Sequence, residues 1–413
     1  MKKLLSLLFL SIFFISLASA VPQIEFVFPT PDNATVTENT SVIINTSITE
    51  SNLANVTFNW NGTNITRDFI NLILLYNLDN SSYLGENDSY IVNSIGDGND
   101  GTVSGATWTS DGKYNGAYSF DGVNDYIAKE NTNTNFPTGT FTLTAWIKPT
   151  TIVGTILSWG ERSGTHTGFK FSLGNTDELR FTTFAVKDYD TTTFHLVTGE
   201  YQFVAVVFDS SYDATFYHYL PSTGVLATQT VTHNVDMNNP GTDADIILGA
   251  YHNAVNDLSS LTNFFNGTID EVALYNNSLS SDEIVSLYKS NLAKYDENKW
   301  NLYVNQSNLS YETYTYQSFA TDFAGNSNST DLRYLSVSED SCSCPGLNQN
   351  WVVNFSHFCT LTTCDLGIGN FSVTNSTGWM NITGIIKSKS GFFLFKDTPQ
   401  TIFINGTGGF RFG

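Results

Sequence analysis

The sequence of 413 residues is poor in basic side chains. It has 18 Lys and Arg against 39 Asp and Glu, for a net charge of −21. Charged residues make up only 14% of the chain, below the ~25% of an average soluble domain, so the acidity reflects a shortage of cations. Because binding to a phosphate backbone needs clustered cations, the composition excludes a nucleic-acid partner.

Long apolar segments are also missing after the first twenty residues. The chain begins with Lys2 and Lys3, an apolar run from Leu4 to Leu17, and the small residues Ala18–Ala20. This pattern is typical of a secretory signal peptide. The run is shorter than the ~20 residues that cross a bilayer, which disfavours the alternative of an uncleaved anchor. We therefore expect residues 1–20 to be removed, and a secreted or cell-surface chain with no transmembrane segment of its own.

Cysteine is scarce and local. The four cysteines are Cys342, Cys344, Cys359 and Cys364, and an even set in an exported protein predicts disulfides. A bridge between the first two would close too tight a loop. Cys342 should therefore pair with Cys359 or Cys364, and Cys344 with the other. A zinc site is the alternative, although C-x-C followed by C-x4-C is poor finger spacing.

Asparagine is abundant and forms eighteen N-x-[ST] sequons, which predict N-glycosylation of an exported chain. No sequon falls between Asn87 and Asn266. A glycan needs solvated surface, so this gap indicates a compact block in the middle of the chain. The predicted glycosylation sites are Asn33, Asn39, Asn45, Asn55, Asn61, Asn64, Asn80, Asn87, Asn266, Asn276, Asn305, Asn308, Asn328, Asn354, Asn370, Asn375, Asn381 and Asn405.

Short segments rich in Val, Ile, Phe, Tyr and Thr recur between clusters of Gly, Asn and Asp, and several alternate apolar with polar residues. Many short strands with little helix predict an all-β sandwich or jelly roll. One helix is expected from about 281 to 290, because Ser280 and Glu283 form a capping box before Ile284 and Leu287. Predicted strands include 141–147, 155–159, 169–173, 201–208, 214–219 and 245–249.

Three motifs occur in order in the middle of the chain. Residues 116–127 read GAYSFDGVNDYI, residues 265–275 read FNGTIDEVALY and are followed by SLSSDEI at 278–284, and residues 93–101 form a Gly- and Asn-rich loop. These motifs resemble laminin G-like domains, with Asn93 where the family commonly has Asp. The resemblance spans roughly 67–292 and implies a concanavalin A-like jelly-roll sandwich.

The flanks carry a second pattern. Strand-like pieces at residues 24–60 are too few to bury a core, and the missing strands appear only at residues 300–337. The stretch 314–326 (YTYQSFATDFAGN) resembles late strands of bacterial and archaeal immunoglobulin-like surface domains. We therefore expect an immunoglobulin-like sandwich interrupted by the laminin G domain, with strands 72–76 and 271–275 side by side. Three domains in series are the alternative.

The predicted division of the chain follows from these patterns. It comprises a signal peptide (1–20), a first immunoglobulin-like part (21–66), a laminin G-like jelly roll (67–292), a second immunoglobulin-like part (293–338) and a Cys-containing β-rich C-terminal region (339–413).

Motifs for catalysis are missing. Sugar-cleaving enzymes need two carboxylates that flank the bond, and glucanases of the concanavalin A-like fold carry them as E-x-D-x-x-E, which does not occur here. Asp270 and Glu271 are adjacent in a predicted strand, which places them on opposite faces. The six histidines have no G-x-S-x-G beside them. We therefore predict no catalytic residue, and a protein that is not an enzyme.

Calcium is the one cofactor that the sequence indicates. Asp97, Asn99 and Asp100 offer hard oxygen ligands beside flexible glycines, and the laminin G resemblance implies a calcium near the rim of the sandwich. Asp79 and Asp270 would form a second, structural cluster if their strands pair.

Exposed aromatic residues are the candidates for ligand binding. Trp108 and Tyr251 lie next to predicted loops, whereas Trp146 and Trp159 alternate with apolar neighbours and are expected in the core. Together with the sequon density and the immunoglobulin-like flanks, this pattern is similar to that of prokaryotic, archaeal-type surface glycoproteins. We predict a non-enzymatic adhesion or recognition protein that binds a glycan or a surface protein through the laminin G-like domain. The alternatives are a structural spacer or envelope coat without ligand, and an accessory module of a truncated glycoside hydrolase.

Overall fold

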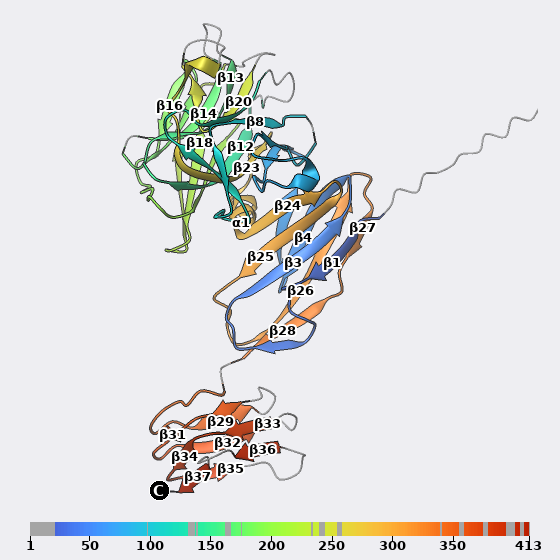
Figure 1. Ribbon diagram of the computed structural model, residues 1–413, viewed down its shortest axis with the longest axis vertical. Coiled ribbons are helices and arrows are strands. Elements are labelled where there is room, and N and C mark those ends of the chain that lie inside the picture. Colours follow the sequence, from blue (N-terminus) through green and yellow to red (C-terminus); the bar gives the residue numbers. More distant parts are fainter. Residues whose placement is uncertain are drawn as a thin grey trace, which may run out of the picture. The chain divides into compact units, whose positions relative to one another are not determined.

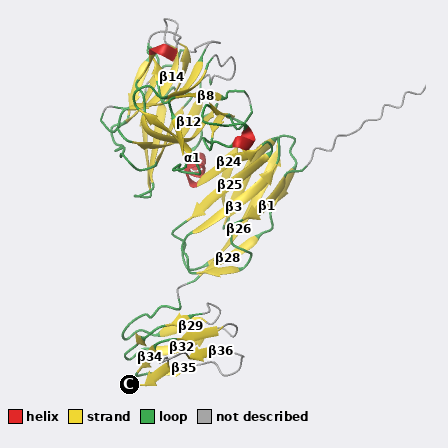
Figure 2. Ribbon diagram, in the orientation of Figure 1, coloured by secondary structure: helices red, strands yellow, loops and turns green. Residues whose placement is uncertain are grey.

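The protein is described by a computed structural model (Figure 1). It covers residues 21–96, 98–130, 137, 139–161, 167–174, 176–232, 234–238, 244–253, 258–338, 341–354, 359–374, 379–393, 401–404 and 409–412. The predicted signal peptide lies outside these residues. Among them, strands dominate and a single α-helix occurs, so the predicted all-β class is confirmed (Figure 2). In the described part of the chain, none of the helices is long and apolar enough to cross a bilayer.

The chain divides into two compact units. The first unit comprises Met1–Asn33, Ser41–Ser307 and Tyr314–Tyr334, and the second comprises Ala34–Thr40, Asn308–Thr313 and Leu335–Gly413. The first unit contains the predicted jelly roll together with most of the predicted immunoglobulin-like strands.

Two eight-stranded antiparallel sheets form the jelly roll. We name them the front sheet, with strand order β16-β15-β14-β13-β20-β11-β8-β7, and the back sheet, with order β19-β18-β17-β12-β23-β10-β9 and β6 beside β23. The front sheet comprises β7 (Tyr90–Ile91), β8 (Gly101–Ser104), β11 (Tyr126–Lys129), β13 (Gly154–Glu161), β14 (Thr167–Leu173), β15 (Leu179–Thr183), β16 (Lys187–Asp190) and β20 (Asp245–Leu248). The back sheet comprises β6 (Leu72–Tyr76), β9 (Thr107–Thr109), β10 (Ala117–Asp121), β12 (Phe141–Pro149), β17 (Gln202–Phe208), β18 (Ala214–Leu220), β19 (Val225–Val231) and β23 (Asn266–Tyr275).

The core lies between the two sheets and is rich in aromatic rings. Phe141 of the back sheet stacks on Phe169 of the front sheet, with 4.6 Å between ring centroids. Trp159 is fully buried in this core, as predicted. Trp146 is also buried, but it lies outside the core cluster and packs against Phe203 on the outer face of the back sheet.

The predicted helix and the predicted strand closure are both present. Helix α1 (Ser281–Lys289) begins with the capping box of Ser280 and Glu283, and its Tyr288 packs on the back sheet at Phe203. Strand β6 pairs with β23, with Tyr76 opposite Val272, so the first and last strands of the jelly roll lie side by side.

A second sandwich is built from segments on both sides of the jelly roll. Strand β3 pairs with β25 over eight residue pairs, from Val42 opposite Gln306 to Thr49 opposite Lys299. This pairing joins residues before the jelly roll to residues after it, which confirms the inserted arrangement. Its sheets contain β1 (Gln23–Val27), β3 (Val42–Thr49), β24 (Ser290–Asp296) and β25 (Lys299–Gln306), and β4 (Leu53–Trp60), β5 (Thr63–Asp68), β26 (Thr313–Asp322) and β27 (Ser327–Ser329). The predicted boundary at 292/293 falls within β24.

Two further strands, β2 (Thr35–Thr37) and β28 (Arg333–Val337), pair in parallel.

The C-terminal region consists of three three-stranded parallel sheets. Successive strands visit the three sheets in turn, so the chain winds as a three-sided parallel β-helix, an arrangement that the sequence did not reveal. Its strands are β29 (Trp351–Asn354), β30 (Thr360–Leu361), β31 (Cys364–Asp365), β32 (Asn370–Thr374), β33 (Trp379–Ile382), β34 (Ile385–Ser388), β35 (Gly391–Phe393), β36 (Thr401–Ile404) and β37 (Gly409–Phe412).

Two disulfides tie the start of this region to its first coil. Cys342 pairs with Cys359, and Cys344 pairs with Cys364. The predicted disulfides are confirmed and their connectivity is resolved. Within the described residues no cysteine is left free, so the zinc alternative is wrong.

Candidate functional site

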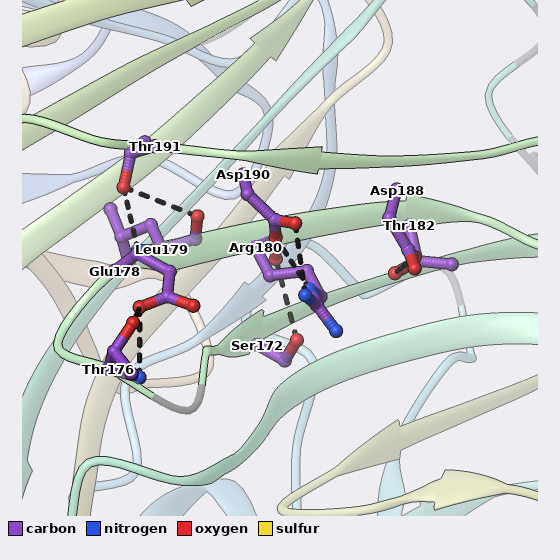
Figure 3. Close-up of polar contacts among 9 residues, drawn as sticks. All are labelled: Ser172, Thr176, Glu178, Leu179, Arg180, Thr182, Asp188, Asp190 and Thr191. Atoms are coloured by element: carbon purple, nitrogen blue, oxygen red, sulfur yellow. Dashed lines mark hydrogen bonds and ion pairs between the residues drawn. The ribbon is translucent and has the colours of Figure 1, made fainter.

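The outer face of the front sheet carries a polar patch on β14, β15 and β16. Strand alternation sends Phe169, Phe171, Phe181 and Tyr189 into the core. The residues between them lie on the opposite face, where Figure 3 shows their polar groups directed toward one another across adjacent strands. This patch, named the front patch, is completed by two aromatic residues and consists of Lys170, Arg180, Thr182, Phe184, Asp188, Asp190 and Tyr251.

Arg180 and Asp190 form the centre of the front patch. They face each other in the β15–β16 ladder, and the guanidinium binds the carboxylate in two places, through Nε to Oδ1 and through Nη2 to Oδ2 at 3.0 Å (Figure 3). Thr182 donates its hydroxyl to Asp188 Oδ1 on the same pair of strands. A bidentate pair holds both side chains in one geometry, so the polar groups are fixed before any ligand arrives.

The aromatic part of the front patch is a stacked pair of rings. Phe184 and Tyr251 lie 5.8 Å apart at an interplanar angle of 25°, and Lys170 Nζ lies 4.0 Å from the centroid of the Tyr251 ring. Burial lowers the pKa of Lys170, and the nearby charge of Asp188 opposes this shift. The front patch therefore offers a ring surface bordered by cations and carboxylates.

A groove lies at the other end of the same sheet, over β7, β8 and β11. It has a volume of about 530 Å³, and its lining includes Tyr90, Asp100, Tyr126, Lys129 and Glu130. The front sheet thus presents two surfaces, one at each end, on which aromatic and polar side chains are mixed.

The two predicted ligand-binding aromatics are not brought together. Tyr251 belongs to the front patch, whereas Trp108 lies on β9 at an edge of the back sheet, opposite Tyr118, with 37% of its surface exposed. Sequence reasoning found Tyr251 but missed Lys170, Phe184, Arg180 and Asp190. The signal available for Lys170 and Arg180 was the strict alternation of apolar and polar residues along 169–173 and 179–182.

Asp270 and Glu271 differ from the prediction that they occupy opposite faces of a strand. Ile269 and Val272 both belong to the core, so the two acids between them both lie on the outer face of β23. The cause is a β-bulge, because Glu271 has a left-handed backbone with φ of 49° and the ladder to β12 shifts register here. Period-two alternation fails wherever a strand carries such an extra residue.

These two buried acids form an electrostatic cluster with Asp79, which is partly exposed. Asp270 Oδ2 accepts a hydrogen bond from the Tyr114 amide at 3.1 Å, and Asp79 Oδ1 accepts one from the Gly116 amide at 3.1 Å. Glu271 accepts from the side chains of Asn77 and Asn291, both at 3.0 Å.

Burial raises the pKa of all three carboxyls, to about 6 for Asp79 and well above the usual range for Asp270 and Glu271. Repulsion from Asp79 adds to the shift at Asp270, and repulsion from Asp270 and Asp79 adds to the shift at Glu271. The buried Arg67 guanidinium opposes the shift at Glu271.

The predicted calcium ligands fall into two groups with different chemistry. In the loop, both carboxylate oxygens of Asp100 are engaged, by the Tyr90 hydroxyl and the Asn93 amide, and the Asn99 carbonyl accepts from Tyr76. Asp97 lies outside the described residues.

Asp79 and Asp270 fit a cation better, because Asp270 Oδ1 is buried and receives no hydrogen bond from the described residues. Among those residues, no group of three or more His, Cys, Asp or Glu side chains is placed to hold a metal ion. Calcium at this pair therefore stays a prediction.

The sequon asparagines that the structure describes are compatible with glycosylation. None of these sixteen asparagines is buried, and Asn375 and Asn405 lie outside the described residues. The histidines do not form a catalytic arrangement with serine in the described part. His252 instead bonds Asp245 at 3.0 Å in a buried pair, and His218 bonds Gln202.

The fold defines the central part of the chain as a concanavalin A-like jelly-roll domain. Residues 121–285, less than half of the chain, match the Laminin_G_3 family model, which describes the concanavalin A-like lectin/glucanases superfamily. The laminin G resemblance inferred from the motifs is confirmed over this segment. A search of curated protein sequences returns no match.

Solved structures with a similar fold include both enzymes and binding domains. Domain 4 of AbnA, an extracellular arabinanase from Geobacillus stearothermophilus in complex with arabinotriose, is 22% identical with a TM-score of 0.38; the match covers 52% of this chain and 98% of that one. The sialidase of Trypanosoma rangeli is 17% identical with a TM-score of 0.40, over 55% of this chain and 33% of the sialidase. The binding domain of botulinum neurotoxin DC is 13% identical with a TM-score of 0.36, over 54% and 53%.

Proposed function

We propose that the protein is a non-enzymatic, secreted or cell-surface glycoprotein that binds a carbohydrate through the front patch of its jelly roll. The observation that carries the proposal is the stacked pair of Phe184 and Tyr251 beside fixed polar groups. Aromatic rings bind the apolar faces of sugars, and charged or hydroxyl side chains orient the sugar hydroxyls. The family match over residues 121–285 is to a superfamily of lectins and glucanases, which supports this class of ligand.

The placement of the carboxylates supports binding rather than hydrolysis. A glycosidase needs two carboxyls on either side of an accessible bond, one of them protonated as the acid. Asp270 and Glu271 share a face but are buried, at 0% and 8% exposure. On the front patch, Asp188 and Asp190 share a face of β16, but Asp190 is held by the Arg180 guanidinium and Asp188 by Thr182.

Export and glycosylation are part of the same proposal. The N-terminal pattern, the two disulfides and the accessible sequons support an extracytoplasmic location. The partner is then a glycan or a glycosylated surface protein that meets the front patch outside the cell.

A glycan array tests the proposal. Residues 21–413 are applied with and without a calcium chelator, together with the variants Tyr251→Ala and Lys170→Ala. We expect binding of at least one glycan class and a loss of tenfold or more in both variants. Trp108→Ala serves as the matched control, because it removes an exposed aromatic residue outside the front patch.

Three outcomes contradict the proposal. Binding that persists in both front-patch variants rejects this site. Shortened products from a bound oligosaccharide indicate an enzyme. Failure to bind any glycan, combined with self-assembly on envelopes, supports the structural spacer instead.

A further inference from the structure

A second polar cleft lies between the jelly roll and the second sandwich. It has a volume of about 340 Å³, within the ~300–1,000 Å³ typical of small-molecule sites. One wall comes from the loops of the jelly roll, and the other comes from β3, β24 and β25. We name it the inter-sandwich cleft; its lining includes Phe28, Asn45, Asp79, Asn115, Tyr295 and Asn301.

The jelly roll and the second sandwich are joined by hydrogen bonds next to the residues that line the cleft. The Asn77 side chain of the jelly roll donates to the Leu292 carbonyl of β24 at 3.2 Å, and Lys294 Nζ of β24 donates to the Ser94 carbonyl at 3.2 Å. The Asn291 side chain of β24 reaches Glu271 on β23. A ligand in the cleft therefore meets a preformed site and needs little ordering of the protein.

The polar lining of the cleft contains side-chain oxygens that lack donors. Asn45 Oδ1 and Asn301 Oδ1 receive no hydrogen bond from any described residue. Both oxygens are shielded from solvent, so each carboxamide must rotate before its oxygen can accept from a ligand in the cleft. The Asp79 carboxylate, which binds the Gly116 amide and the Asn115 side chain, adds acceptor capacity at the opposite wall. Buried polar atoms are normally satisfied, so two orphan oxygens in one cleft point to a missing donor-rich ligand.

Aromatic rings stand at the same cleft. Phe28 is 92% exposed, which is unusual for a large apolar side chain, and Tyr295 is 39% exposed with its hydroxyl 3.2 Å from that of Ser47. The lining contains no Lys or Arg. Rings, carboxamides and a carboxylate match a ligand with many hydroxyl donors and no negative charge. We propose that the inter-sandwich cleft binds a neutral saccharide, as a second site separate from the front patch.

Such a saccharide has two possible sources with the same chemistry. It can be a free ligand, or it can be the chain's own glycan, because Asn45 is the acceptor of the sequon Asn45-Thr46-Ser47 and is only partly buried. Ser47→Ala removes the sequon and keeps the Asn45 carboxamide, whereas Ser47→Thr keeps both. These two variants separate the sources.

The experiment measures binding of methyl glycosides of glucose, galactose, mannose and N-acetylglucosamine to residues 21–413 by saturation-transfer NMR. The chain is produced once without and once with N-glycosylation. In the unglycosylated chain we expect binding of at least one glycoside, a tenfold loss of its affinity in Phe28→Ala and in Asn301→Ala, and binding at the inter-sandwich cleft that persists in Tyr251→Ala, in which the front patch is impaired. Each variant should unfold at the same temperature as the wild type, which would confirm that the loss of affinity is local.

In the glycosylated chain, occupation by the Asn45 glycan blocks the free glycoside in wild type and in Ser47→Thr, and Ser47→Ala restores binding. Equal binding in all three variants identifies a free ligand. The proposal is overturned if no glycoside binds in either preparation, or if binding is lost only in Tyr251→Ala. The second result would leave the front patch as the saccharide site, so failure here is distinguishable from failure of the proposed function.

Discussion

Asp270 and Glu271 are consecutive residues of β23, yet both lie on the outer face of the back sheet, because Glu271 adopts a left-handed backbone inside a β-bulge. The bulge buries two acids side by side, next to Asp79. It also brings Glu271 to a cavity of about 10 Å³, room for about one water, which is lined by Arg67 and Tyr114. The junction between the two sandwiches therefore contains buried ionisable groups.

Arg67→Met should destabilise the first unit strongly. Arg67 is 6% exposed, donates to the Ser290 carbonyl at 3.1 Å, and its charge opposes the raised pKa of Glu271. Removing the guanidinium leaves the buried Ser290 carbonyl without its donor and removes the positive charge near Glu271, which costs about 1–3 kcal/mol. Urea unfolding followed by tryptophan fluorescence measures the loss, with Lys187→Met at a strand edge as the control.

The double variant Arg67→Met, Glu271→Gln tests the coupling. It should recover part of the stability lost in Arg67→Met, because the uncompensated acid is gone. Strictly additive losses would show that Arg67 acts through its bond to Ser290 alone.

The first unit should become more stable as the pH falls from 7 toward 5. The folded state raises the pKa of Asp79 from 3.8 to about 6, so it binds a proton more tightly than the unfolded chain does. A carboxyl whose pKa is higher in the folded state than in the unfolded state stabilises the fold below its unfolded pKa. This stabilisation is lost as the pH rises through the folded pKa. For Asp79, which is partly exposed, the change amounts to about 2 kcal/mol. The urea midpoint of unfolding, measured from pH 4 to pH 7, reports this change in stability.

Asp79→Asn is the matched control for this titration. The amide cannot titrate, and its oxygen can still accept the hydrogen bond from the Gly116 amide. The urea midpoint of this variant should change less between pH 4 and pH 6 than that of the wild type. An unchanged slope would assign the pH dependence to Asp270 or Glu271.

Patterns that depend on local chemistry could be predicted from the sequence. The capping box of Ser280 and Glu283 sets the start of α1, and the alternation along 141–147 and 169–173 sets strands of the two sheets. The inserted arrangement was also predictable, because the strands before residue 66 were too few to close a core.

Features that depend on register or long-range contact could not be predicted. Nothing in the sequence marks the left-handed backbone of Glu271, because successive residues of a strand normally point to alternate faces. Tyr251 and Phe184 are 67 positions apart and stack only because the fold brings the turn after β15 next to the short strand β21 (Tyr251–His252). The short strands after Cys364 indicate β-structure, but nothing in their composition distinguishes parallel coiling from hairpins.

Calcium should raise the thermal stability of the jelly roll if Asp79 and Asp270 bind it. Asp270 is buried, Asp79 is partly buried, and both have a raised pKa, so a divalent cation would relieve their desolvation and mutual repulsion. We expect millimolar calcium to raise the unfolding temperature by several degrees at pH 7 and by less at pH 5, where protons compete. Asp270→Asn should abolish the shift, whereas Asp100→Asn, in the loop whose oxygens are engaged, should leave it unchanged. The opposite pattern would place the ion at the loop.

The disulfides should stabilise the β-helix independently of the jelly roll. Cys342 and Cys359 are separated by 17 residues, and closing a loop of this length stabilises the folded state by about 3 kcal/mol. Cys359 also lies in the core of the β-helix, so its removal leaves a small cavity. The double variant Cys342→Ala, Cys359→Ala should therefore unfold the C-terminal region at a lower temperature, and limited proteolysis should release a fragment that ends near residue 340.

Glycan binding by the front patch should persist in that fragment, because Lys170 and Tyr251 belong to the other unit. Loss of glycan binding together with the β-helix would contradict this separation.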